Sequence, residues 1–332
     1  MAVLVTGGAG YIGSHMAWHL LDAGEDVVVL DSLATGHQWS VPGSASFVQG
    51  EVSDPDALRQ VLSIAPVDAV IHFAGSVSVP ESLENPAKYY RNNTCATLAL
   101  VENCLAAGIE TVLFSSTAAV YGEVGAGPVS ETTPALPTTP YGASKLMVET
   151  MLRDISAAGP LRHAALRYFN VAGADPQGRT GHSTRGATHL LKVACEAALG
   201  TRKGMTVFGT DYATRDGTAE RDFIHVGDLV EAHYLALKRL RANPESFTLN
   251  CGYGRGYTVL ETIEAVRRAT GSEFPVDYGP RRPGDLGSVI ADSTSIRDLL
   301  GWRPALNDID VIARHAIEWE QHLARRNAAE DV

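Results

Sequence analysis

The chain has 332 residues, of which 45% are hydrophobic and 20% are charged. A chain of this length and composition can bury more than one ordinary core, which excludes a disordered protein. Its formal net charge of −11 excludes a general nucleic-acid binder, because such a protein needs a basic surface to replace the counterions of the phosphates.

The four cysteines (Cys95, Cys104, Cys195 and Cys251) stand far apart and form no C-x-x-C motif. We interpret them as free thiols in a reducing compartment. The first predicted strand begins at Ala2, so we expect no signal peptide, and no apolar stretch approaches the length that spans a membrane. We therefore expect a cytoplasmic protein without a membrane partner.

Short apolar runs alternate with amphipathic stretches in the first half of the chain. Strands are predicted over Ala2–Thr6, Asp26–Asp31, Ala45–Gln49, Ala69–Phe73, Thr111–Ser116 and His163–Phe169. Helices are predicted over Ile12–Ala23, Pro55–Ala65, Pro86–Ala107 and Tyr141–Ala157. This alternation predicts an α/β fold with a doubly wound parallel sheet that helices cover on both faces.

The pattern changes after residue 169. The stretch Val171–Thr188 has no clear period and predicts a long functional loop. Further helices are predicted over Ala187–Leu199, Gly227–Leu240, Val259–Thr270 and Ile309–Arg325. We expect a nucleotide-binding domain over residues 1–169, with a returning segment near residues 222–252, and a smaller mixed α/β substrate domain over residues 170–332.

A glycine-rich turn joins the first predicted strand to the first predicted helix. Gly7, Gly10 and Gly13 are spaced as G-x-x-G-x-x-G, a pattern that lets a pyrophosphate approach the N–H groups of a helix N-terminus. Asp31 ends the second strand, where a carboxylate accepts hydrogen bonds from the adenosine ribose and repels a 2′-phosphate. The sequence thus predicts a Rossmann-type site for NAD rather than NADP. A plain glycine turn and an ordinary turn aspartate remain the alternatives.

A phenol and an ammonium group stand four residues apart in Tyr141-Gly142-Ala143-Ser144-Lys145. This spacing puts both side chains on one face of a helix. A neighbouring Lys⁺ and an oxidised nicotinamide ring would both lower the pKa of the tyrosine and let it act as a base. A surface pair formed by chance is the alternative interpretation.

Adjacent hydroxyl groups follow the fifth predicted strand. Ligands of open α/β sheets bind beyond the carboxyl ends of the strands, so we expect Ser115, Ser116 and Thr117 to face the cofactor crevice. One of these hydroxyls could instead cap backbone groups.

Together these motifs resemble the extended short-chain dehydrogenase/reductase family and, within it, the UDP-glucose (UDP-galactose) 4-epimerases. The resemblance covers essentially the whole chain. Besides the glycine loop and the Tyr141–Lys145 pair, it rests on His72-Phe73-Ala74-Gly75, Tyr89-Tyr90-Arg91-Asn92-Asn93, Arg167-Tyr168-Phe169-Asn170, Val207-Phe208-Gly209-Thr210-Asp211-Tyr212 and Arg221-Asp222-Phe223-Ile224-His225-Val226.

The resemblance implies a set of roles. Tyr141 is the acid/base, Lys145 its tuner, and Thr117 stands where the family usually has Ser. The implied contacts of NAD are Gly7, Gly10, Tyr11, Ile12, Gly13, Asp31, Glu51, Val52, Phe73, Ala74, Gly75, Asn92, Ser115, Tyr141, Lys145 and Tyr168. The implied contacts of a UDP-sugar are Thr117, Tyr141, Asn170, His189, Leu190, Val207, Phe208, Arg221, Arg282, Asp285 and Val289.

Several of these roles are specific. Phe208 and Arg221 match the family's contacts to uracil and the diphosphate, while Arg282 and Asp285 match those to the diphosphate and ribose. Either arginine could instead form a surface ion pair. Val289, four positions after Asp285, matches the position beside the C2 substituent of the hexose. A tyrosine there restricts relatives to plain hexoses, and a small residue admits N-acetylated sugars. A core residue in a strand is the alternative for Val289.

The chain departs from the family pattern in three places. Ser76-Val77 stand where the best-known members have a lysine near the cofactor phosphates, Glu51 replaces an aspartate near the adenine, and His189 stands where many relatives have an asparagine. These departures concern details of binding rather than the reaction.

The implied activity is 4-epimerisation of UDP-glucose and UDP-galactose by transient oxidation at C4, with UDP-GlcNAc and UDP-GalNAc as further candidate substrates. The alternatives are an epimerase for another UDP-sugar (an N-acetylhexosamine, a pentose or a uronate) and a non-enzymatic NAD-binding regulator. A 4,6-dehydratase is rejected, because Ala118 and Ala119 occupy the positions where that chemistry needs two carboxyl groups. The resemblance also implies a homodimer that pairs through Ala96–Ala107 and Leu146–Ala157. The eleven histidines are scattered, so no metal site is predicted.

Overall fold

The centre of the molecule is a parallel β-sheet. The computed structural model describes residues 1–125, 127–184, 186–282 and 285–330. Within these residues the sheet contains β1 (Ala2–Thr6), β2 (Val27–Asp31), β3 (Ser46–Gln49), β4 (Val67–His72), β5 (Thr111–Thr117), β6 (Arg162–Tyr168) and β10 (Phe247–Cys251). All neighbouring strands are parallel, in the order β10-β6-β5-β4-β1-β2-β3. The predicted parallel sheet is thereby confirmed.

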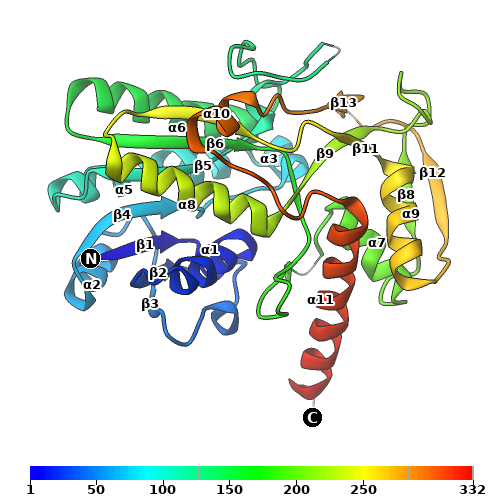
Figure 1. Ribbon diagram of the computed structural model, residues 1–332, viewed down its shortest axis with the longest axis horizontal. Helices are drawn as coiled ribbons and strands as arrows, with labels where there is room; N and C mark the ends of the chain where they lie inside the picture. The colour runs from blue at the N-terminus through cyan, green and yellow to red at the C-terminus, as the bar shows by residue number, and fades with distance from the viewer. Residues whose placement is uncertain (126, 185, 283–284, 331–332) are drawn as a thin grey trace.

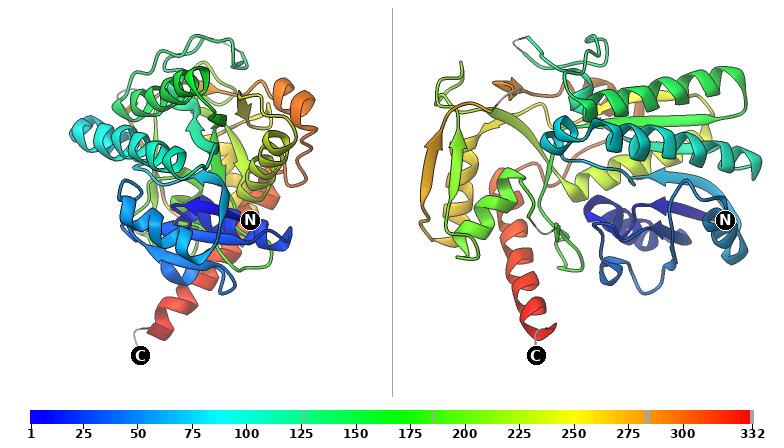
Figure 2. Two further views of the ribbon diagram at one scale, coloured as in Figure 1. Left: turned by 90° about the vertical axis from the view of Figure 1, so that its left-hand side faces the viewer. Right: turned by 180° about the vertical axis from the view of Figure 1, so that it is seen from behind.

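Helices cover both faces of this sheet, as Figures 1 and 2 show. The helices concerned are α1 (Tyr11–Asp22) and α8 (Val226–Ala242) on one face and α2 (Pro55–Ile64), α5 (Ala96–Ala106) and α6 (Pro140–Ala158) on the other. Met16 and Leu229 belong to the hydrophobic cluster on the first face, and Leu58, Leu100 and Val148 to that on the second. Because both faces are buried, the strands are apolar along their length and polar groups gather at their ends.

The second half of the chain builds a smaller layer beside the sheet (Figure 1). Its strands are β7 (Asn170–Ala172), β9 (Glu220–His225), β11 (Gly256–Thr258) and β13 (Ser288–Val289) in one sheet and β8 (Met205–Phe208) and β12 (Val276–Gly279) in another. Its helices are α7 (Leu190–Ala198), α9 (Val259–Thr270), α10 (Thr294–Leu300) and α11 (Ile309–Glu330). The chain also returns to the large sheet, because β10 pairs with β6 and α8 packs on α1.

The predicted elements are found, with shifts at their ends. The predicted helix over Pro86–Ala107 is helical without a break from Pro86 to Ala106, but α4 (Pro86–Tyr89) and α5 flank a π-helical turn within it, η2 (Tyr90–Cys95). A π-turn depends on packing around it, which a hydrophobic period does not report. Val171–Thr188 is not wholly irregular, because its start belongs to β7, which pairs with β9. The shorter elements are η1 (Gln38–Ser40), α3 (Val79–Glu84) and η3 (Ala118–Val120).

A buried ion pair joins α6 to the large sheet. Arg167 on β6 donates to Glu149 on α6 from Nη2 at 2.6 Å and from Nε at 2.9 Å, and both side chains are largely buried. Ser116 on β5 donates to the same carboxylate at 2.5 Å. Arg167 also donates to the Tyr121 hydroxyl, which in turn donates to Asn250 on β10. This network fixes α6 against the carboxyl ends of β5, β6 and β10.

We predict that Glu149→Gln destabilises the fold strongly, because it leaves the Arg167 guanidinium buried without a counter-charge. Breaking such a pair costs about 3–5 kcal/mol of unfolding free energy. Glu110→Gln is the matched control, since Glu110 pairs with Arg162 on the same strand but both side chains are about 40% exposed. That change should cost less than about 1 kcal/mol. Urea unfolding measures both, and equal losses would contradict the role given to the buried pair.

Candidate active site

The glycine loop connects β1 to α1 as the sequence predicts. Gly7 has φ = 68°, and a Cβ on Gly13 would lie 2.1 Å from the Gly7 carbonyl oxygen. Both positions therefore exclude a side chain, the first by its backbone conformation and the second by close packing. A Cβ on Gly10 would meet only the Gly7 oxygen, at 3.2 Å, so Gly10 leaves space in front of the helix.

The start of α1 fits an anionic group. Its N-terminus has no side-chain cap and no acidic residue in its first turn, which leaves its first N–H groups available for an anion. Asp31 ends β2 beside this loop and is 8% exposed; its carboxylate accepts from the N–H groups of Ala9 at 2.9 Å and Leu33 at 2.8 Å. The dinucleotide predicted from sequence therefore fits: pyrophosphate at the helix start and ribose at the carboxylate.

Other predicted cofactor residues lie around this loop, and their side chains differ in solvent exposure. Tyr11 donates its hydroxyl to the Gly173 carbonyl at 2.7 Å, so it ties α1 to the loop after β7. Phe73, Ala74 and Gly75 follow β4 at the same sheet edge, and Ile12 lies in the first turn of α1. Glu51 is exposed after β3, whereas Val52 is buried in the core.

The Tyr141–Lys145 pair lies at the start of α6. Thr139 caps this helix by accepting from the Gly142 N–H, and Pro140 occupies its first turn. Lys145 is 3% exposed and donates to the Ser115 carbonyl on β5 at 2.9 Å. Burial lowers the pKa of Lys145 to about 8, against the opposing charge of Glu149. The ammonium is therefore still mostly protonated at pH 7.

Tyr141 differs from the sequence-based expectation in its ionisation. Burial raises the pKa of its phenol, and a hydrogen bond with Thr117 only partly opposes this. Lys145 is not among the groups that lower it, because its ammonium is directed to the Ser115 carbonyl. In the protein alone the phenol is thus protonated at neutral pH, and additional positive charge is required beside it to form the phenolate.

The three hydroxyls at the end of β5 take different directions. Thr117 contacts Tyr141 and also accepts from the Ala119 N–H at 3.1 Å. Ser115 contacts the Tyr168 hydroxyl on β6. The expectation that Ser116 also faces the crevice was wrong, because its hydroxyl donates to Glu149 on the opposite face. Alternation along a strand sends neighbouring side chains to opposite faces, so adjacent hydroxyls cannot all share one crevice.

The π-turn contributes a buried polar residue that sequence reasoning missed. Asn93 is 2% exposed, accepts from the Ser76 N–H at 2.7 Å and donates to the Ser144 hydroxyl at 3.1 Å. Its neighbour Asn92, which the resemblance selected, donates to the Ser76 hydroxyl instead. Asn93 therefore connects the segment after β4 to α6, directly beside Lys145. Its presence in the Tyr89-to-Asn93 motif was the available signal.

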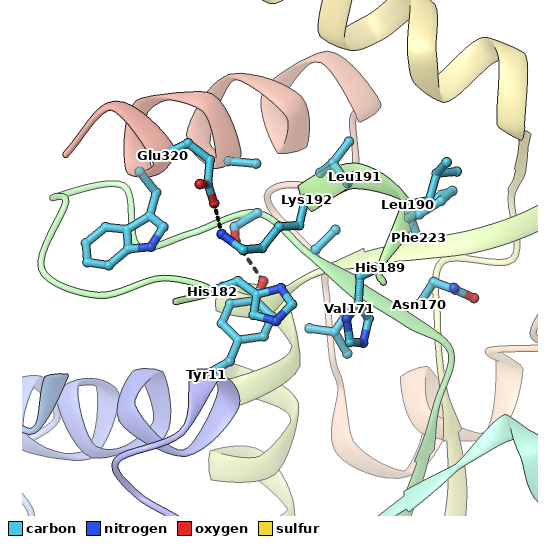
Figure 3. A pocket seen from close by; sticks show the side chains of 14 residues that line it. Tyr11, Asn170, Val171, His182, His189, Leu190, Leu191, Lys192, Phe223 and Glu320 are labelled. Carbon is cyan, nitrogen blue, oxygen red and sulfur yellow. Dashed lines mark hydrogen bonds and ion pairs between the residues drawn. The ribbon is translucent and has the colours of Figure 1, made fainter. Parts of the chain in front are cut away.

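A pocket between the two layers gathers predicted cofactor and substrate residues (Figure 3). Its lining includes Tyr11, Asn170, His189 and Leu190. Figure 3 also shows Lys192, from α7, directed to Glu320 on α11, and their ion pair measures 2.5 Å. Sequence reasoning missed this pair, because Lys192 and Glu320 are 128 residues apart and only the fold brings them together.

The predicted uridine-diphosphate residues lie together at the edge of the second layer. The Arg282 guanidinium lies 3.9 Å from the centre of the Phe208 ring, and Arg221 pairs with Asp285 at 2.6 Å. Arg221 thus forms an ion pair, although its side chain is only 17% exposed, and Arg282 contacts an aromatic ring. The side chain of Val207 is buried in the core, so only its backbone can face a ligand. Pro283 and Gly284 of the same motif lie outside the described residues.

Val289 lies in a small apolar cluster beside the catalytic strand end. It is 9% exposed and belongs to one cluster with Val120, Tyr121, Phe169 and Ala291. Val289 is therefore a packed strand residue, as the alternative interpretation states. The cluster nevertheless adjoins η3 and the end of β6, next to Thr117 and Asn170. Val289 can therefore pack in this cluster and also line the predicted sugar site.

The described part of the chain has neither a membrane-spanning helix nor a cluster of metal-ligating side chains. Residues 1–125, 127–184, 186–282 and 285–330 contain no helix long and apolar enough to cross a bilayer. The same ranges contain no group of three or more His, Cys, Asp or Glu side chains that could hold a metal ion. Cys95, Cys104, Cys195 and Cys251 are free cysteines.

Comparison with known proteins defines the family. Residues 3–252 match the model of the NAD dependent epimerase/dehydratase family. A UDP-glucose 4-epimerase of Azospirillum brasilense is 52% identical over 321 residues, which are 97% of this chain and 92% of that protein. The chain therefore belongs to the NAD dependent epimerase/dehydratase family, and the prediction of NAD as cofactor is confirmed.

Two solved structures have the same fold. The crystal structure of UDP-glucose 4-epimerase from Brucella ovis in complex with NAD has a TM-score of 0.92 and 42% identity, covering 96% of this chain and 97% of that one. The UDP-Glc/GlcNAc 4-epimerase from Campylobacter jejuni has a TM-score of 0.84 and 44% identity, covering 97% of this chain and 99% of that one.

We predict that apo-protein binds NAD at least about tenfold more tightly than NADP, because the Asp31 carboxylate repels a 2′-phosphate. Asp31→Asn removes that charge and should narrow the ratio of the two dissociation constants, measured by calorimetry. Asp26→Asn, at the opposite end of β2, is the matched control and should leave the ratio unchanged. Tighter binding of NADP by the wild type would refute the role of Asp31.

Proposed function

We propose that this chain is a UDP-glucose 4-epimerase that interconverts UDP-glucose and UDP-galactose. One observation carries the proposal: the Tyr141 phenol contacts the Thr117 hydroxyl beside the buried Lys145 ammonium, at the carboxyl end of β5. The names of the relatives at 42–52% identity agree with it. Ala118 and Ala119 follow Thr117 directly, so the site lacks the carboxyl groups that a dehydration at C5 and C6 would need.

In the mechanism Tyr141 removes the proton of the sugar 4-hydroxyl, and it returns a proton to the same oxygen when the hydride comes back to the opposite face of C4. Thr117 donates to the same oxygen and holds the developing ketone. Bound NAD supplies a hydride acceptor for C4 and a positive ring that favours the phenolate. Lys145 adds a second positive charge nearby, since its ammonium is held on the Ser115 carbonyl. The 4-keto sugar then turns over while the UDP stays anchored.

The UDP anchor follows from charge. The protein carries a net charge of −11, so a dianionic diphosphate has to be held by locally placed arginines. Arg221 and Arg282 are these groups in the proposal, with Phe208 against the uracil and Asp285 on the ribose. Arg221 would exchange part of its pairing with Asp285 for the diphosphate.

The proposal extends to location and assembly. The four free cysteines are consistent with a cytoplasmic enzyme. Partly exposed apolar side chains on α5 and α6, Leu98 and Met147, lie on the helices that the resemblance selects for a homodimer. We propose that two copies pair through these helices.

The activity is tested by incubating purified protein with UDP-galactose without added cofactor and following UDP-glucose. We expect turnover in the wild type and a loss of about 100-fold or more in kcat for Tyr141→Phe, because the proton-transfer group is gone. Tyr278→Phe, at an exposed tyrosine on β12, is the matched control. NAD content and unfolding temperature should stay near normal in both. A mild loss in Tyr141→Phe would transfer the proton-transfer role to Thr117 or water.

The second candidate activity is the interconversion of UDP-GlcNAc and UDP-GalNAc, and it rests on Val289. Valine has neither the ring nor the hydroxyl of tyrosine, so it leaves room for an acetamido group. We predict that Val289→Tyr lowers kcat/KM for the N-acetylated pair about 10- to 100-fold relative to the plain pair, a steric effect of roughly 1–3 kcal/mol. Val289→Ala should keep the wild-type ratio. An unchanged ratio in Val289→Tyr, or a wild type inactive on UDP-GlcNAc, would show that Val289 is not the gate.

A further inference from the structure

A segment of the long loop, residues 180–184, lies directly against the glycine loop. The Thr180 hydroxyl is 2.7 Å from the hydroxyl of Ser14 on α1, and the Ser183 carbonyl lies 3.4 Å from His37 Nε2. Ser183 and Thr184 line a small pocket together with Gly10 and Thr35. The segment therefore lies over the uncapped N-terminus of α1, where an anion can bind.

A column of four aromatic rings stands behind this segment and joins the two layers of the protein. His37 and Trp39 come from the turn after β2, and Trp319 and His322 come from α11. Successive ring centres are 5.1, 6.1 and 5.2 Å apart, with interplanar angles of 18°, 28° and 9°. The Arg326 guanidinium lies 4.1 Å from the centre of the Trp39 ring. Such stacked contacts add to the burial of the rings themselves.

The column is fixed at both ends to the parts that it joins. On the glycine-loop side, the His37 N–H and the Ser40 hydroxyl both donate to the Ala9 carbonyl, at 2.9 and 2.8 Å. On the other side, Trp319 packs on Gly181 so closely that a Cβ there would lie 2.3 Å from the indole Cγ. Moving Trp319 would therefore weaken the support of the segment that lines the pocket.

The rest of the loop is anchored independently. Arg179 pairs with Asp175 at 2.8 Å and with Asp22 at the end of α1 at 2.9 Å, and its guanidinium lies over the ring of Trp18. These contacts hold the loop beside α1. Within residues 180–184 the His182 ring stacks on Tyr11, with ring centres 4.7 Å apart, and meets the His189 ring edge-on at 4.8 Å. The contact of Trp319 with Gly181 therefore joins the His182–His189 contact as a support from the second layer.

We propose that Trp39 and Trp319 are positioning residues that retain the dinucleotide, by holding residues 180–184 over its pyrophosphate. This inference rests on the proposed function, in which the same NAD molecule is used in every catalytic cycle and stays bound between cycles. The N–H groups of α1 would hold the pyrophosphate from one side, and Ser183 and Thr184, which line the same small pocket, would enclose it from the other. Release of the dinucleotide requires the segment to lift, and the ring column opposes that motion.

The test is the exchange of bound NAD in the holoprotein. Protein is incubated with excess radiolabelled NAD, and the label retained after gel filtration is followed in time. We expect Trp39→Ala to exchange at least about tenfold faster than the wild type, because an interaction lost in the bound state appears chiefly in the dissociation rate. Gly181→Ala should do the same, since its methyl group displaces Trp319. Trp39→Phe, which keeps a ring in the column, should restore slow exchange.

Gly43→Ala is the matched control, because Gly43 is exposed and a Cβ there has no atom within 4 Å. Its exchange rate should equal that of the wild type. Wild-type exchange rates in both Trp39→Ala and Gly181→Ala, with folded protein by thermal unfolding, would overturn the inference alone. A wild type that neither contains NAD nor takes up the label would contradict the proposed function as well.

Discussion

The hydrogen bond from the Lys145 ammonium to the Ser115 carbonyl, 2.9 Å long and fully buried, is the contact on which the geometry of the site depends. It joins the second turn of α6 to the end of β5 and so sets Tyr141 against Thr117. A buried ammonium requires such a partner, because its desolvation is otherwise too costly. The same bond keeps the ammonium from touching the phenol, which is why burial dominates the pKa of Tyr141 in the protein alone.

In this arrangement the protein and the cofactor each contribute to activating the tyrosine. The protein supplies position and one fixed positive charge, and it leaves the phenol protonated until more positive charge arrives. In the proposed function, Tyr141 becomes a base only when the oxidised cofactor is beside it. The behaviour suits a site that must avoid removing protons when no hydride acceptor is present. Glu149 supports the arrangement from the next turn of α6, where it opposes the loss of charge on Lys145 and binds Arg167.

Much of this site could be predicted from the sequence, because its signals are local. The glycine loop, Asp31 and the Tyr141–Lys145 spacing each depend on a few residues within one turn or strand end. Ser116 was misplaced because three adjacent hydroxyls were taken together, whereas a strand alternates its faces. Asn93 was missed because its role depends on a π-turn that packing imposes.

The contacts between the two layers could not be predicted at all. Trp39 and Trp319 are 280 residues apart, and neither belongs to a motif; only the path of α11 brings their rings together. The same holds for the ion pair between Lys192 and Glu320. Such pairs are set by tertiary packing, which the hydrophobic periodicity and the residue spacing of a sequence do not report. In our proposal the ring contact of Trp39 with Trp319, one of these contacts, also retains the cofactor.

The central claim is that the hydride taken from sugar C4 is returned to the same carbon within one closed site. The most direct measurement uses UDP-galactose carrying deuterium at C4, converted by purified protein without added cofactor and analysed by NMR. The account predicts UDP-glucose that retains the deuterium at C4. Replacement of that deuterium by hydrogen from the solvent would contradict the account, because it would mean that C4 loses a proton to a base instead of a hydride.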